Sequence, residues 1–103
     1  MGRCRKLLRL AKQKESLFSD KVRKHLDAIG AFHFRAHGFL AGLPDLICCY
    51  RGRFVALEIK ASAKAPRSKL QEHILRKIAK AGGYATFVYP ENFDFLKEDL
   101  EKM

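Results

Sequence analysis

The sequence has few acidic residues, few cysteines and no long apolar run, and each shortage excludes a class of protein. Among 103 residues there are 11 Asp and Glu against 21 Lys and Arg, which gives a formal net charge of +10. The longest stretch without a charged side chain, residues 81–90, is too short to cross a bilayer, and nothing resembles a signal peptide. The three cysteines form neither a CxxC zinc spacing nor a disulfide framework. We therefore expect a cytoplasmic protein without a membrane partner.

What is present is a basic body with an acidic end. Residues 91–103 hold five acids and two bases, a net charge of −3, so residues 1–90 carry 19 bases and six acids, a net charge of +13. A field of this sign attracts polyanions, of which nucleic acid is the commonest partner, although a basic surface can also serve solubility alone. Residues 1–14 hold six bases and no acid, which predicts a basic N-terminal arm, either a short amphipathic helix lying on phosphate or a disordered tail.

Hydrophobic periodicity in the remainder, residues 15–103, predicts one mixed α/β domain around a small sheet. A chain of this size buries roughly 60–65% of its unfolded surface, so a partner subunit would stabilise it. The expected helices are 15–29, about 70–81 and 93–103, and the expected strands are 31–35, 45–50, 53–60 and 84–89. His33 and His37 lie in a segment of strand and loop, where we expect ordinary histidines and no metal ligands.

The second and third strands form a hairpin that brings two acids together. If Arg51 and Gly52 are the central turn residues, Asp45 lies directly opposite Glu58, with their Cβ atoms about 5 Å apart. Lys60 falls on the same face of the sheet. Two carboxylates this close repel unless one is protonated or a cation lies between them, and a hard divalent ion such as Mg²⁺ accepts oxygen ligands of this kind. The arrangement is typical of metal-assisted phosphodiester hydrolysis.

A plainer interpretation of the same residues stays open. Asp45 can cap the loop that follows Pro44, while Glu58 and Lys60 form a surface ion pair at a strand edge. The pairing also depends on the turn length, because a shift of one residue moves Asp45 to the other face of the sheet.

The order of these residues resembles the PD-(D/E)XK nuclease signature. Gly42-Leu43-Pro44-Asp45 is followed, after twelve residues, by Glu58-Ile59-Lys60, and the string is most similar to the stand-alone phage form of the virus-type replication and repair nuclease domain, VRR-NUC. Further matching positions, in chain order, are Glu15, Gly52, Gln71 and Gly82-Gly83. The resemblance implies a single restriction-endonuclease-like domain, in which a mixed central sheet with an active-site hairpin is flanked by helices.

The resemblance also implies roles for individual residues. Asp45, Glu58 and the backbone carbonyl of Ile59 would bind Mg²⁺ or Mn²⁺, and Lys60 would position the nucleophilic water. Gln71 would support Lys60 or the scissile phosphate.

Gln71 also lies three residues after Ser68 and can complete a capping box, so both roles can hold at once. Glu15 would reach the site directly or through water, although an acid in a first turn stabilises a helix in any case. Candidate phosphate contacts are Arg35, Arg51, Arg53, Lys64, Arg67 and Lys69.

Together these features predict a Mg²⁺-dependent DNA endonuclease. The family resemblance implies a homodimer that is selective for DNA structure, similar to Holliday junction resolvases, and that acts in replication, repair or recombination. A phage-encoded protein of this kind would work in the cytoplasm of the host cell. The alternatives are a non-catalytic basic DNA-binding or architectural protein, and a nuclease subunit that needs a partner.

Overall fold

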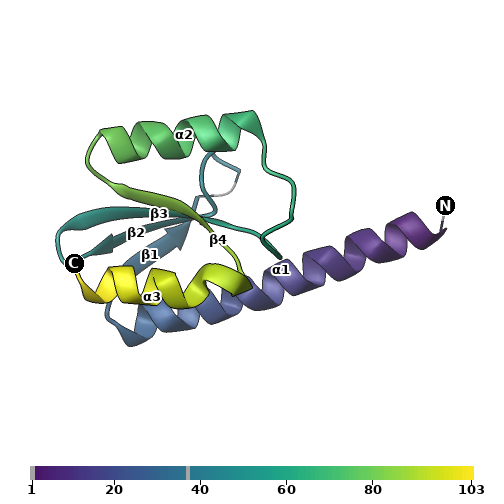
Figure 1. Cartoon of the computed structure of the whole chain (residues 1–103), viewed down its shortest axis with the longest axis horizontal. Helices are drawn as coiled ribbons and strands as arrows, with labels where there is room; N and C mark the ends of the chain where they lie inside the picture. The colour runs from purple at the N-terminus through teal and green to yellow at the C-terminus, as the bar shows by residue number, and fades with distance from the viewer. Residues whose placement is uncertain (1, 37) are drawn as a thin grey trace.

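The structure is a computed structural model that describes residues 2–36 and 38–103, and the side chains of all of these except residues 2–6 and 8. His37 therefore lies outside the described residues. The elements, in chain order, are α1 (Gly2–Ala28), β1 (Phe32–Arg35), β2 (Leu46–Tyr50), β3 (Arg53–Ile59), α2 (Lys69–Lys80), β4 (Tyr84–Val88), a short 3₁₀ turn η1 (Pro90–Asn92) and α3 (Phe93–Glu101) (Figure 1).

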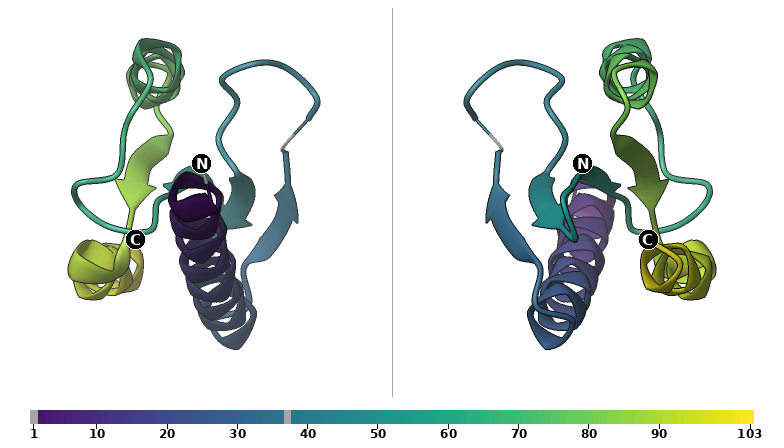
Figure 2. Two further views of the ribbon diagram at one scale, coloured as in Figure 1. Left: turned by 90° about the vertical axis from the view of Figure 1, so that its right-hand side faces the viewer. Right: turned by 90° about the vertical axis from the view of Figure 1, so that its left-hand side faces the viewer.

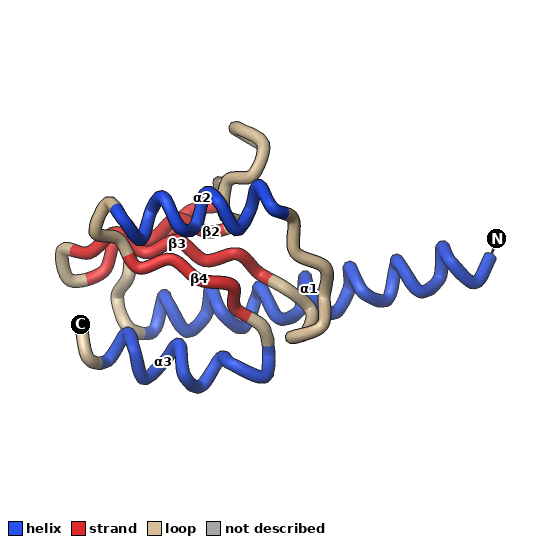
Figure 3. The backbone as a smooth tube through the Cα atoms, turned by 45° about the horizontal axis from the view of Figure 1, so that its top comes forward, coloured by secondary structure: helices blue, strands red, loops and turns tan. Residues whose placement is uncertain are grey.

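The strands form one mixed sheet in the order β1-β2-β3-β4 (Figure 3). The first two pairings are antiparallel, while β3 and β4 run parallel and are joined by the crossover through α2. This topology confirms the predicted α/β domain with a single sheet.

The β2–β3 hairpin has the predicted register. Leu46 pairs with Leu57 and Tyr50 with Arg53. Both turn residues have positive φ, 50° at Arg51 and 78° at Gly52, as a type I′ turn requires. Continuing this register by one step puts Asp45 opposite Glu58.

Helices α1 and α3 cover one face of the sheet and α2 lies on the other (Figure 2). The main apolar core lies on the α1/α3 side because alternate residues of β2 and β3 point there. Its fully or almost fully buried members include Val22, Leu26, Leu46, Cys48, Val55, Leu57, Ile59, Val88, Leu96 and Leu100. The predicted C-terminal helix is confirmed as α3, which adds the last two of these residues.

The α2 side is only partly covered. α2 packs against β4 and β3, so the half of this face formed by β1 and β2 stays open. Phe32, Phe34 and Phe54 are 71%, 47% and 49% exposed there. We call these three residues the aromatic patch.

Helix α1 is longer than predicted, because it begins at Gly2 and continues without interruption through residues 2–14. Sequence analysis predicted a helix only from Glu15, since no apolar period marks the first fourteen residues as core-facing. The helical alternative for the basic arm therefore agrees with the structure, and the disordered tail does not. In the part of the chain that the structure describes, no helix is long and apolar enough to span a membrane.

Candidate active site

Asp45 ties together the open end of the hairpin. It directly precedes β2, and its Oδ2 accepts a hydrogen bond from the backbone N–H of Ile59, at 2.8 Å. Its backbone carbonyl accepts from the N–H of Ala36, at 3.0 Å, just after β1. One short acidic residue thus joins the ends of three strands, which is the structural role expected of a loop cap. The carboxylate stays half-buried.

Glu58 is buried in the middle of the sheet. It is 5% exposed, and among the residues that the structure describes it is the charged residue that is classed as buried. The burial follows from the strand order, because β3 lies between β2 and β4. Burial, followed by the negative charge of Asp45 and a hydrogen bond with it, raises the pKa of Glu58 to about 8, although Lys60 opposes the shift. The predicted pair of neighbouring carboxylates is therefore present, and the surface ion pair at a strand edge is wrong.

Gln71 joins Glu58 to Lys60. Its Nε2 donates to Glu58 Oε1 at 3.1 Å, and its Oε1 accepts from Lys60 Nζ, also at 3.1 Å. The Gln71 amide thus links the Glu58 carboxyl group and the Lys60 ammonium group, both at the end of β3, in one chain of hydrogen bonds. We call Asp45, Glu58, Lys60 and Gln71 the hairpin cluster.

The same glutamine caps α2. Ser68 Oγ accepts from the Gln71 N–H at 3.0 Å, and Gln71 Oε1 accepts from the Ser68 N–H at 3.2 Å, which completes the predicted capping box. Because the cap fixes the backbone at Gln71, it also fixes where the amide meets Glu58 and Lys60. Both roles proposed for Gln71 are compatible in one conformation.

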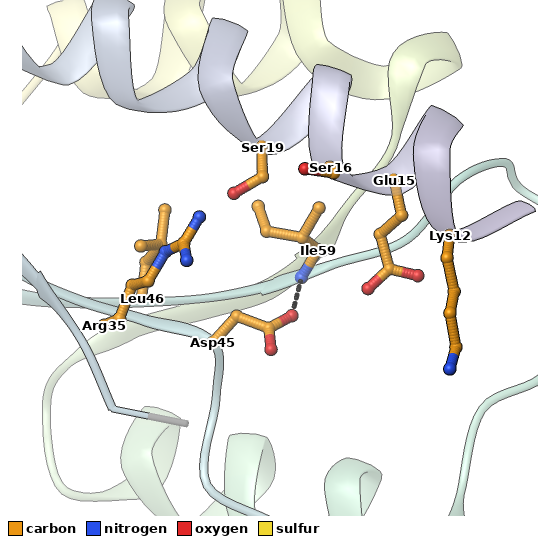
Figure 4. Close-up of a pocket in the computed structure, with 8 residues that line it drawn as sticks. All are labelled: Lys12, Glu15, Ser16, Ser19, Arg35, Asp45, Leu46 and Ile59. Atoms are coloured by element: carbon orange, nitrogen blue, oxygen red, sulfur yellow. Dashed lines mark hydrogen bonds between the residues drawn. The ribbon is translucent and has the colours of Figure 1, made fainter. Parts of the chain in front are cut away.

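Glu15 reaches the site from α1. A pocket of about 230 Å³ lies between α1 and the open end of the hairpin, and in Figure 4 the carboxylates of Glu15 and Asp45 both point into it. Its lining residues are Lys12, Glu15, Ser16, Ser19, Arg35, Asp45, Leu46 and Ile59. Asp45 is therefore shared, with the pocket on one side and the buried Glu58 on the other.

The hairpin cluster offers a cation two neighbouring carboxylates, those of Asp45 and Glu58. No three His, Cys, Asp or Glu side chains are grouped for metal binding anywhere in residues 2–36 and 38–103. Burial first, and the charge of Asp45 second, raise the pKa of Glu58, so an unneutralised negative charge is unfavourable at this position. A divalent cation supplies the positive charge that this pair needs, so the donor set fits one hard metal ion whose remaining ligands are waters.

The predicted phosphate contacts fall into three places. Arg35 lines the pocket. Arg51 and Arg53 lie at the turn end of the hairpin, away from Asp45, where Arg51 Nη1 donates to the Met103 carbonyl at 2.9 Å.

The other three candidates lie in the segment between β3 and α2 and at the first residue of α2, Lys69. Lys64 and Lys69 are exposed, and the Arg67 guanidinium lies over the Phe87 ring, 4.5 Å from its centroid. The structure thus brings one of the six residues into the pocket.

Sequence analysis missed three residues of the pocket, namely Lys12, Ser16 and Ser19. Lys12 precedes Glu15 by three positions and Ser19 follows it by four, so helical spacing was the available signal. For Lys12 it went unused because the helix was expected to begin at Glu15, whereas Ser16 and Ser19 fall within the expected helix and were given no role.

His33 is an ordinary partner of a surface acid, with its Nε2 at 2.7 Å from Asp27 Oδ1.

Comparison with known proteins adds no relative, because no family model, curated protein or solved structure matches this chain.

Proposed function

We propose that the chain is a divalent-metal-dependent DNA endonuclease of the PD-(D/E)XK type, similar to the VRR-NUC domain. The observation that carries the proposal is the hairpin cluster: a buried glutamate next to an aspartate, with Gln71 linking that glutamate to a lysine two residues along the strand. A structural salt bridge would not need the second carboxylate. Hydrolysis of a phosphodiester uses both.

The carboxylates have the metal-binding role in this proposal. Asp45, Glu58 and the carbonyl of Ile59 hold Mg²⁺ or Mn²⁺, which would supply positive charge to polarise the phosphate and stabilise its transition state. Asp45 stays oriented by the N–H of Ile59, and Glu58 by Gln71. Fixed oxygens of this kind reduce the reorganisation that cation binding requires.

Lys60 positions the attacking water. An ammonium has three donors, and Gln71 Oε1 engages one of them, so donors remain for a water and for a phosphate oxygen. The water oxygen forms the new bond to phosphorus as the bond to the leaving oxygen breaks; the attacking water gives up its proton to bulk water, and solvent supplies the proton that the leaving oxygen takes. Gln71 acts as a positioning residue because it holds Lys60.

DNA is the proposed substrate because residues 1–90 carry a net charge of +13 around an acidic site. We extend the proposal to branched DNA as the preferred form and to a homodimer as the active species, both from the resemblance to VRR-NUC. Equilibrium sedimentation of the purified chain tests the second point.

The experiment is a cleavage assay on labelled four-way junction, flap, duplex and single-stranded DNA, with Mg²⁺, Mn²⁺ or chelator. Asp45→Asn and Lys60→Met should abolish cutting while DNA binding remains. Matched controls are Asp94→Asn in α3 and Lys80→Met at the end of α2, two exposed positions outside the hairpin cluster.

Metal-dependent cutting that both site variants lose supports the nuclease. Binding without cutting under every condition would instead support an architectural DNA-binding protein, or a subunit that needs a partner. Unchanged cutting by Lys60→Met would contradict the role of the hairpin cluster.

A further inference from the structure

The N-terminal half of α1 projects beyond the domain (Figure 1). Among the side chains that the structure describes, the first buried one in the helix is Phe18, and every one from Leu7 to Lys14 is exposed. The molecule is accordingly long, 48 × 27 × 22 Å. This part of the helix contributes nothing to the core, so its sequence is free to serve another purpose.

One face of the projecting helix continues the wall of the pocket. Lys12, Ser16 and Ser19 line the pocket and follow one another at intervals of four and three residues, which keeps them on one helical face. Arg9 precedes Lys12 by three positions, and the sequence has Arg5 four positions earlier. The row that borders the candidate site therefore becomes cationic as it leaves the domain.

The opposite face has a different character. Leu7, Leu10 and Leu17 recur at helical spacing and are 65%, 44% and 65% exposed, with Lys14 among them. The two faces can thus be tested separately, because Arg9 and Lys12 lie on the pocket face and Lys14 on the other.

The cations of the pocket face repel one another. Arg9 and Lys12 are three residues apart, and like charges at this spacing destabilise a helix. Residues 1–14 contain no acid, and the first one on this face is Glu15, three residues after Lys12, so the repulsion is greatest in the projecting part of the helix. A polyanion along this face would remove the repulsion, whereas a second copy of the same cationic face would increase it.

We infer that the Arg9/Lys12 face of α1 binds the DNA backbone and guides one strand into the pocket beside Asp45. The inference deepens the proposed function and rests on it for the identity of the polyanion. From Lys12 to the start of α1 the helix extends about 15 Å, which matches four or five base-pair steps of a duplex. The bound groups are phosphates, so this face carries no sequence preference.

The test is fluorescence anisotropy of a labelled duplex with the full chain in chelator, over a series of salt concentrations. The double variant R9Q/K12Q should reduce the slope of log affinity against log salt by about 2, one unit for each phosphate that is no longer neutralised. K14Q is the matched control, and its slope should stay that of the wild type. Circular dichroism verifies that the helix is retained in each variant.

Equal slopes for R9Q/K12Q and the wild type would overturn the inference, as would a reduction of the slope by about 1 in K14Q, which is the same effect per charge removed and would indicate a diffuse field. If R9Q/K12Q leaves DNA binding intact but changes the sedimentation of the protein, the face binds a second copy and the inference is wrong.

Cleavage is scored separately on the same DNA with Mg²⁺. A wild type that binds through Arg9 and Lys12 but never cuts supports the role of α1 and contradicts the nuclease. A wild type that cuts DNA, but whose binding does not depend on Arg9 or Lys12, supports the nuclease and contradicts the role of α1.

Discussion

The two faces of the sheet use the same strands for different purposes. On the α1/α3 face, Leu46, Val55 and Leu57 join a continuous apolar core. On the α2 face, the next residue along β3 is the buried acid Glu58, and the start of β3 together with β1 exposes the aromatic patch. Alternation along β3 thus separates a stabilising surface from one that carries a costly polar group.

This difference indicates that the residues at the Glu58 position of the α2 face do not serve the stability of the fold. An acid that is 5% exposed beside a second acid opposes folding, and filling the site with apolar side chains would avoid that cost. We attribute its presence to the proposed cation site. Substitutions on the two faces should accordingly affect different measurements.

The largest expected effect is on catalysis from the α2 face. Lys60→Met should lower the cleavage rate about 10³-fold, roughly 4 kcal/mol of transition-state stabilisation, because the attacking water loses its positioning group. The free energy of unfolding should change by less than about 1 kcal/mol, since Lys60 is half-buried at the end of its strand. Single-turnover cleavage and urea denaturation measure the two quantities, and a stability loss that accounts for the whole rate change would break the comparison.

The core face should give the opposite pattern. Leu57→Ala removes a fully buried side chain and should cost about 3 kcal/mol of unfolding free energy. Phe54→Ala on the same strand, in the aromatic patch, should cost under about 1 kcal/mol. Urea denaturation compares them, with Ile59→Val as the milder core change if Leu57→Ala does not fold. Equal costs at Leu57 and Phe54 would show that the α2 face is a core after all.

Glu58 should make stability depend on pH when metal is absent. Its folded-state pKa, about 8, lies above its ordinary value of 4.5, so its contribution is fully present below about pH 4.5 and is lost as the pH rises through 8. In chelator we expect the unfolding free energy to fall by roughly 5 kcal/mol over that window. Glu58→Gln should flatten the dependence, and an equally steep curve in this variant would refute the assignment.

Gln71 allows the cap and the site to be separated. Ser68→Ala should cost about 1 kcal/mol of stability and slow cleavage less than Gln71→Leu does, because the hydrogen bonds of the Gln71 amide to Glu58 and Lys60 remain. Gln71→Leu should cost a similar amount and also slow cleavage about tenfold, since Lys60 loses its acceptor. Equal rates in the two variants would remove Gln71 from the site.

The smallest effect should come from His25, which lies under α3 on the core face. Burial, then the positive charge of Lys97, lowers its pKa, so the folded protein favours the neutral ring. Its contribution is present above about pH 6.5 and is lost as the pH falls through the lowered value. His25→Gln should abolish this acid-side loss of under about 1 kcal/mol, whereas replacing the exposed His73 should not. Identical acid-side curves for the wild type and His25→Gln would reject the assignment.

Much of the fold was predictable from local chemistry. The Arg51-Gly52 turn requires positive φ at both positions, and that requirement set the register that pairs Asp45 with Glu58. Ser68 and Gln71 predicted a capping box for the same reason, since the residues involved are only three apart.

The features that the sequence did not predict depend on how the elements pack against one another, or on an element that packs against nothing. The start of α1 at Gly2 was missed because the projecting half has no core-facing period. The open aromatic patch was missed because alternation predicts which residues share a face but not how far α2 extends over it. The burial of Glu58 has the same origin, since only the position of β4 makes β3 a central strand.

The most direct test of the account is calorimetric titration of the purified protein with Mn²⁺. We predict that the wild type binds the ion and that Asp45→Asn and Glu58→Gln each abolish binding, while Asp94→Asn binds as the wild type does. Absence of Mn²⁺ binding by the wild type, or undiminished binding by both site variants, would contradict the claim that the buried acid pair is a cation site.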